Sequence, residues 1–367
     1  MMSSVIRAMS VVVCAVAATL ARAGGDEAAA FGDVRMDRMQ VIGSHNSYKR
    51  PPQPELMKLM SLAGRGVEGI DYGHISLTDQ LNLGLRNLEL DVYHDPEGGR
   101  YANPLGNRLL EEAGGTPWEH DPDGELKGAG FKVIHDVDFD FRTWHYRLES
   151  ALAALRAWSE ANPGHVPVVV TLNCKQGKGQ VPGAADAAEF DSAALRALDA
   201  ALAAGVGEVR VLRPDAVRGE SATLREAVVA RGWPTVGAAK GRFVFVLDEG
   251  GQTRARYLQA FNGLRGAAMF VDVAPDEPEA AIFVMNEPDR DEVKIRALTE
   301  QGFMVRTRAD ADTKEVRETD FARFEAAKRS GAQVITTDYY IPDRKMSDRY
   351  MVRFDGDVFV RRRPERP

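Results

Sequence analysis

Cysteine is scarce in this chain: among its 367 residues, only Cys14 and Cys174 are cysteines. A small scaffold held together by several disulfides is therefore excluded, and the fold must be stabilised by a hydrophobic core. Cys174 follows a strongly apolar run, so we predict a buried small hydrophobic residue there and not a nucleophile.

An excess of positive charge is also missing. The 47 Lys and Arg residues are outnumbered by 54 Asp and Glu residues, giving a formal net charge of -7. A dedicated nucleic-acid-binding protein is expected to be basic, so we predict no nucleic-acid partner. The same balance gives no global attraction to anionic lipid, so any membrane contact must be local or transient.

The N-terminal apolar run is too short to cross a bilayer comfortably. It extends from Met9 to Leu20, follows Arg7 and precedes Ala21-Arg22-Ala23. A positive start, about a dozen apolar residues and an A-x-A ending are typical of a secretory signal peptide. We therefore predict a signal peptide at residues 1–23 and a secreted or periplasmic mature protein, with an uncleaved anchor as the alternative.

The rest of the chain alternates short apolar runs with amphipathic helical segments. The runs are nearly continuous in apolarity, which favours strands buried on both faces of a parallel sheet. They occupy residues 39–43, 85–93, 131–136, 166–173, 242–250, 267–274, 281–287, 303–310 and 332–340. About eight βα units predict one domain, residues 24–367, folded as a (β/α)8 barrel of TIM type.

Nine candidate strands are one too many for eight places. We expect the surplus to be either 267–274 or 281–287. A doubly wound open sheet is the alternative fold, but no Gly-rich phosphate loop follows the first strand.

Polar side chains gather at the expected carboxyl ends of the strands, where barrel enzymes hold their active sites. Residues two apart on one strand point to the same side, so Glu89 and Asp91 form one such pair, and Asn173 and Lys175 form another. The remaining strand-end candidates are His45, Asn46, His135, Asp338 and Tyr339.

These residue types suit one chemistry. Carboxylate and amide oxygens prefer a hard cation, calcium or magnesium over zinc. Two histidines could form an acid/base pair, and Lys175 could hold an anion near the metal. Such a set suits transfer at phosphorus, although each residue alone has a plain structural reading, such as Glu89 and Asp91 paired with Arg86 or Lys132.

Five segments of the chain are specific enough to compare with known families: "GSHNSY", "QLNLGLRNLELDVYHDPEGG", "GFKVIHD", "GFMVRTRADAD" and "SGAQVITTDYYIPD". Together they resemble the calcium-dependent, secreted bacterial branch of phosphoinositide-specific phospholipase C. Glycerophosphodiester phosphodiesterases, a related barrel family, would show His-Arg-Gly after the first strand, where this chain has His45-Asn46.

The resemblance implies a distorted TIM-type barrel that cleaves phosphatidylinositol with calcium, giving diacylglycerol and a (cyclic) inositol phosphate. It implies catalytic roles for His45, His135 and Glu89, with Glu89 or His45 taking the proton of the inositol 2-hydroxyl and His135 protonating the leaving oxygen. The implied calcium ligands are Asn46, Glu89, Asp91 and Asn173.

Asn173 stands where relatives are expected to carry a glutamate, which weakens the predicted metal site without abolishing it. The implied substrate contacts are Lys175, Arg306, Asp338 and Tyr339, with Asp338 also able to fix the tautomer of His45. The expected partner is phospholipid at a membrane surface, met transiently by a monomer.

Two other functions stay open at this point. One is a phosphodiesterase acting on glycerophosphodiesters or another lipid headgroup. The other is a barrel that has lost turnover but keeps calcium or inositol-lipid binding, a reading that Asn173 favours.

Overall fold

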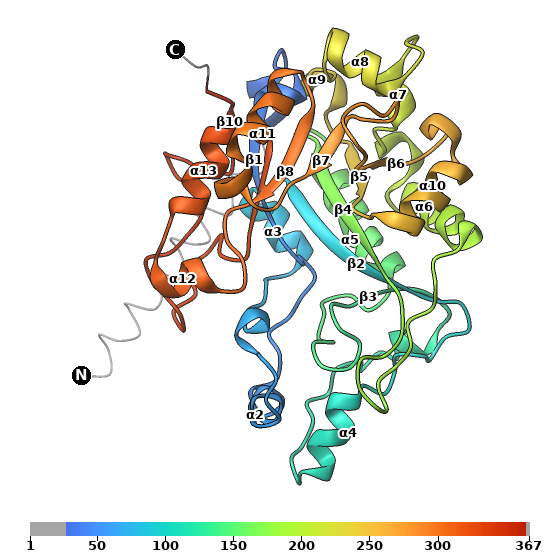
Figure 1. Ribbon diagram of the computed structural model, residues 1–367, viewed down its shortest axis with the longest axis vertical. Coiled ribbons are helices and arrows are strands. Elements are labelled where there is room, and N and C mark those ends of the chain that lie inside the picture. Colours follow the sequence, from blue (N-terminus) through green and yellow to red (C-terminus); the bar gives the residue numbers. More distant parts are fainter. Residues whose placement is uncertain (1–26, 365–367) are drawn as a thin grey trace.

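Eight parallel strands of the computed structural model, which describes residues 27–364, curve into a nearly closed barrel (Figure 1). Their order is β6-β5-β4-β2-β1-β9-β8-β7, and neighbours along this path are hydrogen-bonded. No ladder joins β6 to β7 among the described residues, so the ring is open there. The predicted TIM-type fold and its distortion are confirmed, whereas the predicted signal peptide at residues 1–23 lies outside the described residues.

The strands have the following bounds. They are β1 (Met39–Ser44), β2 (Asn87–Asp95), β3 (Gly130–Val133), β4 (Val168–Lys175), β5 (Phe243–Leu247), β6 (Met269–Val271), β7 (Ile282–Val284), β8 (Met304–Arg308), β9 (Val334–Thr337) and β10 (Val360–Arg362).

The helices follow the strands around the barrel (Figure 1). They are α2 (Pro54–Leu62), α3 (Leu77–Leu83), α4 (Leu105–Glu112), α5 (Leu148–Ala161), α6 (Ser192–Val206), α7 (Pro214–Arg218), α8 (Leu224–Arg231), α9 (Val236–Ala239), α10 (Gly251–Ala260), α11 (Pro288–Glu300), α12 (Lys314–Glu318) and α13 (Ala322–Ser330). Short 3-10 turns are η1 (Glu27–Phe31), η2 (Met36–Arg38), η3 (Glu68–Ile70), η4 (Glu125–Lys127), η5 (Glu208–Arg210) and η6 (Asn262–Leu264).

The surplus strand is not the one that the sequence suggested. Both β6 and β7 are barrel strands, so the expectation that 267–274 or 281–287 is surplus is wrong. The extra one is β3, which pairs antiparallel with the far end of β2, from Val92↔Val133 to Asp95↔Gly130. The tail strand β10 also pairs antiparallel, with β1.

A glycine brings the first two barrel strands together. A Cβ atom on Gly43 would lie 2.4 Å from Cβ of Asn87, the residue that pairs with it across the β1–β2 ladder. Only glycine permits such a close approach, which explains why a glycine ends the apolar run of β1. The approach sets the residues that follow β1 beside those that β2 carries.

Most strands of the barrel carry buried apolar side chains on both of their faces. In β4 and β5, Val168, Val170, Phe243 and Phe245 are fully buried. Helix α5 buries Leu148, Leu152 and Leu155 against this wall, as its 3.6-residue pattern predicts. Because the wall is rigid and packed, the polar residues that follow the strands are held in fixed relative positions.

Candidate active site

The turn after β1 carries His45, the first catalytic candidate, and Asn46, which shapes the turn. Asn46 has a φ of 47°, in the left-handed region that asparagine tolerates better than most residues. Its side-chain amide donates to the hydroxyl of Tyr72 at 2.9 Å. This turn fixes His45 next to Tyr72, whose ring stacks on the imidazole at 6.1 Å between centroids.

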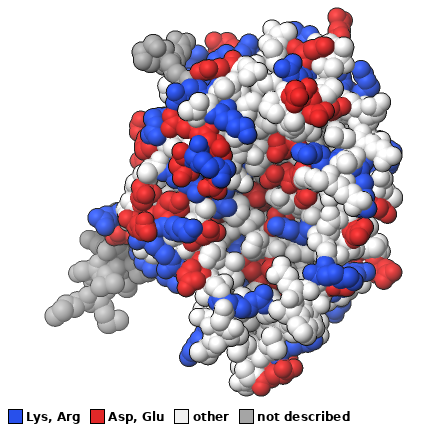
Figure 2. All heavy atoms as spheres, in the orientation of Figure 1, with Lys and Arg blue, Asp and Glu red and all other residues white. Residues whose placement is uncertain are grey.

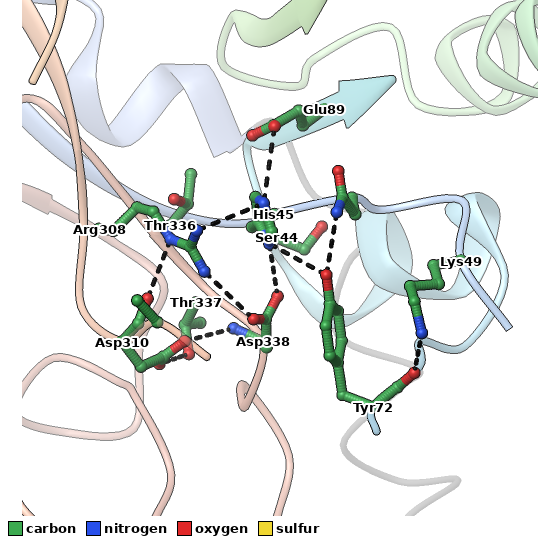
Figure 3. A network of polar contacts seen from close by, with 12 residues as sticks. Ser44, His45, Lys49, Tyr72, Glu89, Arg308, Asp310, Thr336, Thr337 and Asp338 are labelled. Atoms are coloured by element: carbon green, nitrogen blue, oxygen red, sulfur yellow. Dashed lines mark hydrogen bonds and ion pairs between the residues drawn. The ribbon is translucent and has the colours of Figure 1, made fainter. Parts of the chain in front are cut away.

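His45 lies in a network of charged side chains from β8 and β9 (Figure 3). Its Nδ1 is 3.1 Å from Asp338 Oδ1, and its Nε2 is 3.4 Å from the guanidinium of Arg308. Arginine can only donate, so Nε2 accepts and Nδ1–H donates to the carboxylate, which defines the neutral tautomer. Burial, reinforced by Arg308, lowers the pKa of His45 well below its ordinary value of 6.5.

A second carboxyl group, that of Asp310, contacts the segment that carries Asp338, the carboxylate partner of His45. Asp310 accepts from the backbone N–H of Asp338 at 2.8 Å and from the Thr337 hydroxyl. Burial, and then the charge of Asp338, raises the pKa of Asp310 to about 7. Arg308 also pairs with Asp338 at 3.3 Å, so this cation serves both the carboxylate and the imidazole (Figure 3).

The second histidine has a different environment. His135 follows β3, and its Nδ1 donates to Asp140 Oδ2 at 2.8 Å. Burial opposes protonation, but the hydrogen bond and the charge of Asp140 outweigh it, so the pKa of His135 is raised above 6.5. Asp140 is held in turn by the buried ammonium of Lys49 at 3.2 Å, which also donates to the Tyr72 carbonyl at 2.6 Å.

The two predicted carboxylate ligands lie side by side with the predicted amide ligand. In the β2–β4 ladder, Asp91 is the partner of Asn173, and the Asn173 amide lies 3.3 Å from Glu89 Oε1. Glu89 also approaches His45, with 3.9 Å between Oε1 and Nε2. The structure thus brings these residues together as the sequence predicted.

Each carboxylate is already paired with a basic side chain. Arg306 of β8, only 1% exposed, forms an ion pair with Glu89 across the barrel. The ammonium of Lys175 lies 2.9 Å from Asp91 Oδ2. Lys175 and Arg306, the predicted substrate contacts, are therefore in contact with the predicted metal ligands. Figure 2 shows acidic and basic side chains close together near the middle of one face.

The donor set can still accept calcium. Asp91 is 1% exposed, and its carboxylate lies against the Lys175 ammonium, 2.9 Å from Oδ2. Carboxylate oxygens that are buried against a cation suit a metal ion as well. No three His, Cys, Asp or Glu side chains cluster as a metal site within residues 27–364, so calcium would need the amide oxygens of Asn46 and Asn173 in addition to Glu89 and Asp91.

One predicted substrate contact is corrected. Tyr339 is 2% exposed, its hydroxyl contacts Met346 Sδ at 3.4 Å, and its ring meets Tyr350 edge-on. Tyr339 belongs to a buried cluster with Tyr350, so its ring is not exposed for stacking on a substrate. Asp338 is buried as well and contacts Nδ1 of His45, the atom through which it was expected to fix the tautomer.

Sequence reasoning missed four residues of the site: Lys49, Tyr72, Asp140 and Arg308. A signal existed for Arg308, because Arg306, Arg308 and Asp310 alternate along one strand and so share a face. No comparable pattern marks Lys49 or Tyr72, whose roles depend on contacts between loops.

A pocket of about 260 Å³ opens between His135 and Lys175 and is lined also by Arg65, Tyr93 and Gln176. A larger groove of about 980 Å³, lined by Arg38, Arg296, Arg361 and other residues, contains none of the predicted site residues. The smaller pocket is therefore the candidate substrate site, since two of the predicted site residues, His135 and Lys175, line it.

Comparisons with known proteins agree with this geometry. A family model described as calcium-dependent phosphoinositide phospholipase C matches residues 34–364. The fold is similar to a calcium-dependent phosphoinositol-specific phospholipase C from Pseudomonas sp. (TM-score 0.56, 15% identity, 91% of this chain and 97% of that one). It is also similar to a Ca2+-dependent phosphatidylinositol-specific phospholipase C from Streptomyces antibioticus (TM-score 0.50, 18% identity, 83% and 95%). No curated protein matches the sequence.

Proposed function

This chain belongs to the calcium-dependent phosphoinositide phospholipase C family, a family of phosphodiester-cleaving enzymes, and we propose that it cleaves phosphatidylinositol between glycerol and phosphate. The products are diacylglycerol and a cyclic inositol phosphate, formed when the inositol 2-hydroxyl attacks phosphorus. The mature domain, residues 24–367, acts as an exported monomer.

The observation that carries this proposal is the opposite tuning of two histidines. Burial and then Arg308 lower the pKa of His45, whereas the hydrogen bond and charge of Asp140 raise the pKa of His135. A pair of titratable groups pushed in opposite directions supplies one general base and one general acid. The cleavage needs one of each, because one hydroxyl loses a proton and one oxygen gains it.

In the proposed reaction, Nε2 of His45 takes the proton of the inositol 2-hydroxyl as its oxygen bonds to phosphorus. The bond from phosphorus to the glycerol oxygen breaks, and Nε2 of His135 gives that oxygen its proton. Arg308 stands beside Nε2 of His45, where its guanidinium can donate to the phosphoryl oxygens as their charge grows. Glu89, the other expected base, is held in a buried ion pair with Arg306, whereas Nε2 of His45 has only a 3.4 Å contact with Arg308, so the proposal assigns the base to His45.

Calcium would be held by the oxygens of Asn46, Glu89, Asp91 and Asn173. When bound, it would supply positive charge that lowers the pKa of the attacking hydroxyl and offsets charge on the phosphoryl group.

The substrate is a lipid, so the enzyme must meet a membrane surface. Within residues 27–364 no helix has the length and apolarity needed to span a bilayer. Trp118 and Trp144 are each 42% exposed, and Leu62, at the end of α2, is 77% exposed. Partly exposed tryptophans suit the interface between water and lipid, which supports transient contact.

The test compares three substrates. Phosphatidylinositol and sphingomyelin are presented in matched vesicles, and glycerophosphoinositol is presented in solution. We expect release of a five-membered cyclic phosphate from phosphatidylinositol, which ³¹P NMR distinguishes from an open monoester. Preferential hydrolysis of glycerophosphoinositol would favour the phosphodiesterase alternative. Binding of inositol lipid without turnover would favour the non-catalytic barrel. The ion pairs that Glu89 and Asp91 form with basic side chains support that reading.

A further inference from the structure

Both predicted carboxylate ligands are paired with a cation before any metal enters the site. The negative charges of Glu89 and Asp91 are matched by the positive charges of Arg306 and Lys175. Asn173, the amide beside them, contributes no charge. A divalent cation must therefore compete with these basic groups for the two carboxylates.

The two basic side chains differ in their freedom to move. Arg306 is 1% exposed, and besides Glu89 it donates to Asn286, so its position is fixed from two sides. The side chain of Lys175 is 37% exposed and lines the 260 Å³ pocket at the mouth. Its four-carbon stem can carry the ammonium into water at little cost.

We propose that Lys175 is a built-in competitor for the metal. Its ammonium occupies Asp91, a predicted calcium ligand that is 1% exposed, and it swings toward solvent when a divalent cation binds. Lys175 thereby sets the calcium affinity, and Asn173 keeps that affinity low by withholding a third carboxylate. This inference rests on the proposed function, because it concerns the metal that the function requires.

The test is a calcium titration by isothermal calorimetry, without lipid, on the full mature protein. Lys175→Met removes the competing charge and keeps the length of the stem, so its Kd for calcium is expected to fall about tenfold. Lys175→Gln serves as a second variant if the first folds poorly. The matched control is Lys178→Met, the same charge change at an exposed lysine that pairs with Asp186.

Tighter binding in the Lys175 variants with an unchanged Kd in the Lys178 variant supports the inference. An unchanged or weaker Kd in the Lys175 variants, an equal gain in the Lys178 variant, or no calcium binding by any of these proteins would each overturn it. Because the readout is binding, a protein that fails to cleave phosphatidylinositol would refute the proposed function and leave this titration readable.

Discussion

Replacing Arg306 with methionine should strongly destabilise the barrel. The substitution removes the guanidinium that pairs with Glu89, and the carboxylate, 4% exposed, then has no cation in contact. Its remaining near neighbours are the Asn173 amide at 3.3 Å and the neutral imidazole of His45 at 3.9 Å. Breaking a buried pair from one side costs about 3–5 kcal/mol, so we expect a loss of that size in the free energy of unfolding.

A nearby carboxyl group adds to this cost. Burial raises the pKa of Asp248, at the end of β5, to about 7, and the charge of Arg306 opposes that rise while Glu89 reinforces it. Without Arg306, the charge of Glu89 still raises the pKa of Asp248, and the positive charge that opposes this rise is lost. The variant should therefore shift the pKa of Asp248 further upward.

Urea unfolding followed by tryptophan fluorescence measures the effect, and a double-mutant cycle isolates the pair. Glu89→Gln together with Arg306→Met should cost less than the sum of the single variants, because each single variant leaves one buried charge unpaired and the double variant leaves none. The matched control is Arg156→Met, which removes a guanidinium from the solvent-exposed pair with Glu160 on α5 and should cost only a small fraction as much. An Arg306 variant as stable as the Arg156 variant would refute the buried ion pair.

Three further outcomes follow from the site. In a plot of kcat/KM against pH, activity should fall below the lowered pKa of His45, where the base becomes protonated, and above the raised pKa of His135, where the acid loses its proton. Asp140→Asn should move the alkaline limb of the plot to lower pH, and an unmoved limb would remove His135 from the acid role. Chelation of calcium should abolish release of cyclic inositol phosphate and added calcium should restore it, while turnover indifferent to chelator would refute the metal assignment. His135→Ala should lose at least about 100-fold in kcat yet keep the calcium Kd of the wild type, and persistent turnover would mean that the acid lies elsewhere.

The barrel could be predicted because its determinants are local. Apolar runs of strand length that alternate with amphipathic helices are visible in any window of the sequence. The surplus strand could not be identified the same way, since residues 131–136 are as apolar as a barrel strand. Only the long second strand, which extends beyond the wall as far as Asp95, provides the edge on which β3 pairs.

The same distinction applies to the site. Glu89 and Asp91 were predicted to share a face because that follows from strand geometry alone. Their partners were not predicted, because which side chains meet across a barrel depends on strand tilt and stagger. The burial of Tyr339 was missed for a related reason: the segment that covers it, around Tyr350, comes later in the chain and has no regular pattern.

The arrangement of charges links stability to catalysis in this barrel. Two acids in a buried mouth would repel each other in a protein without metal, and Arg306 and Lys175 remove that repulsion. What stabilises the metal-free fold must then weaken metal binding, because the same oxygens serve both cations. The two histidines are not subject to this competition, because the carboxylates that contact their Nδ1 atoms, Asp338 and Asp140, are outside the proposed ligand set. Acid/base chemistry in this chain can therefore be pre-organised while calcium occupancy stays adjustable.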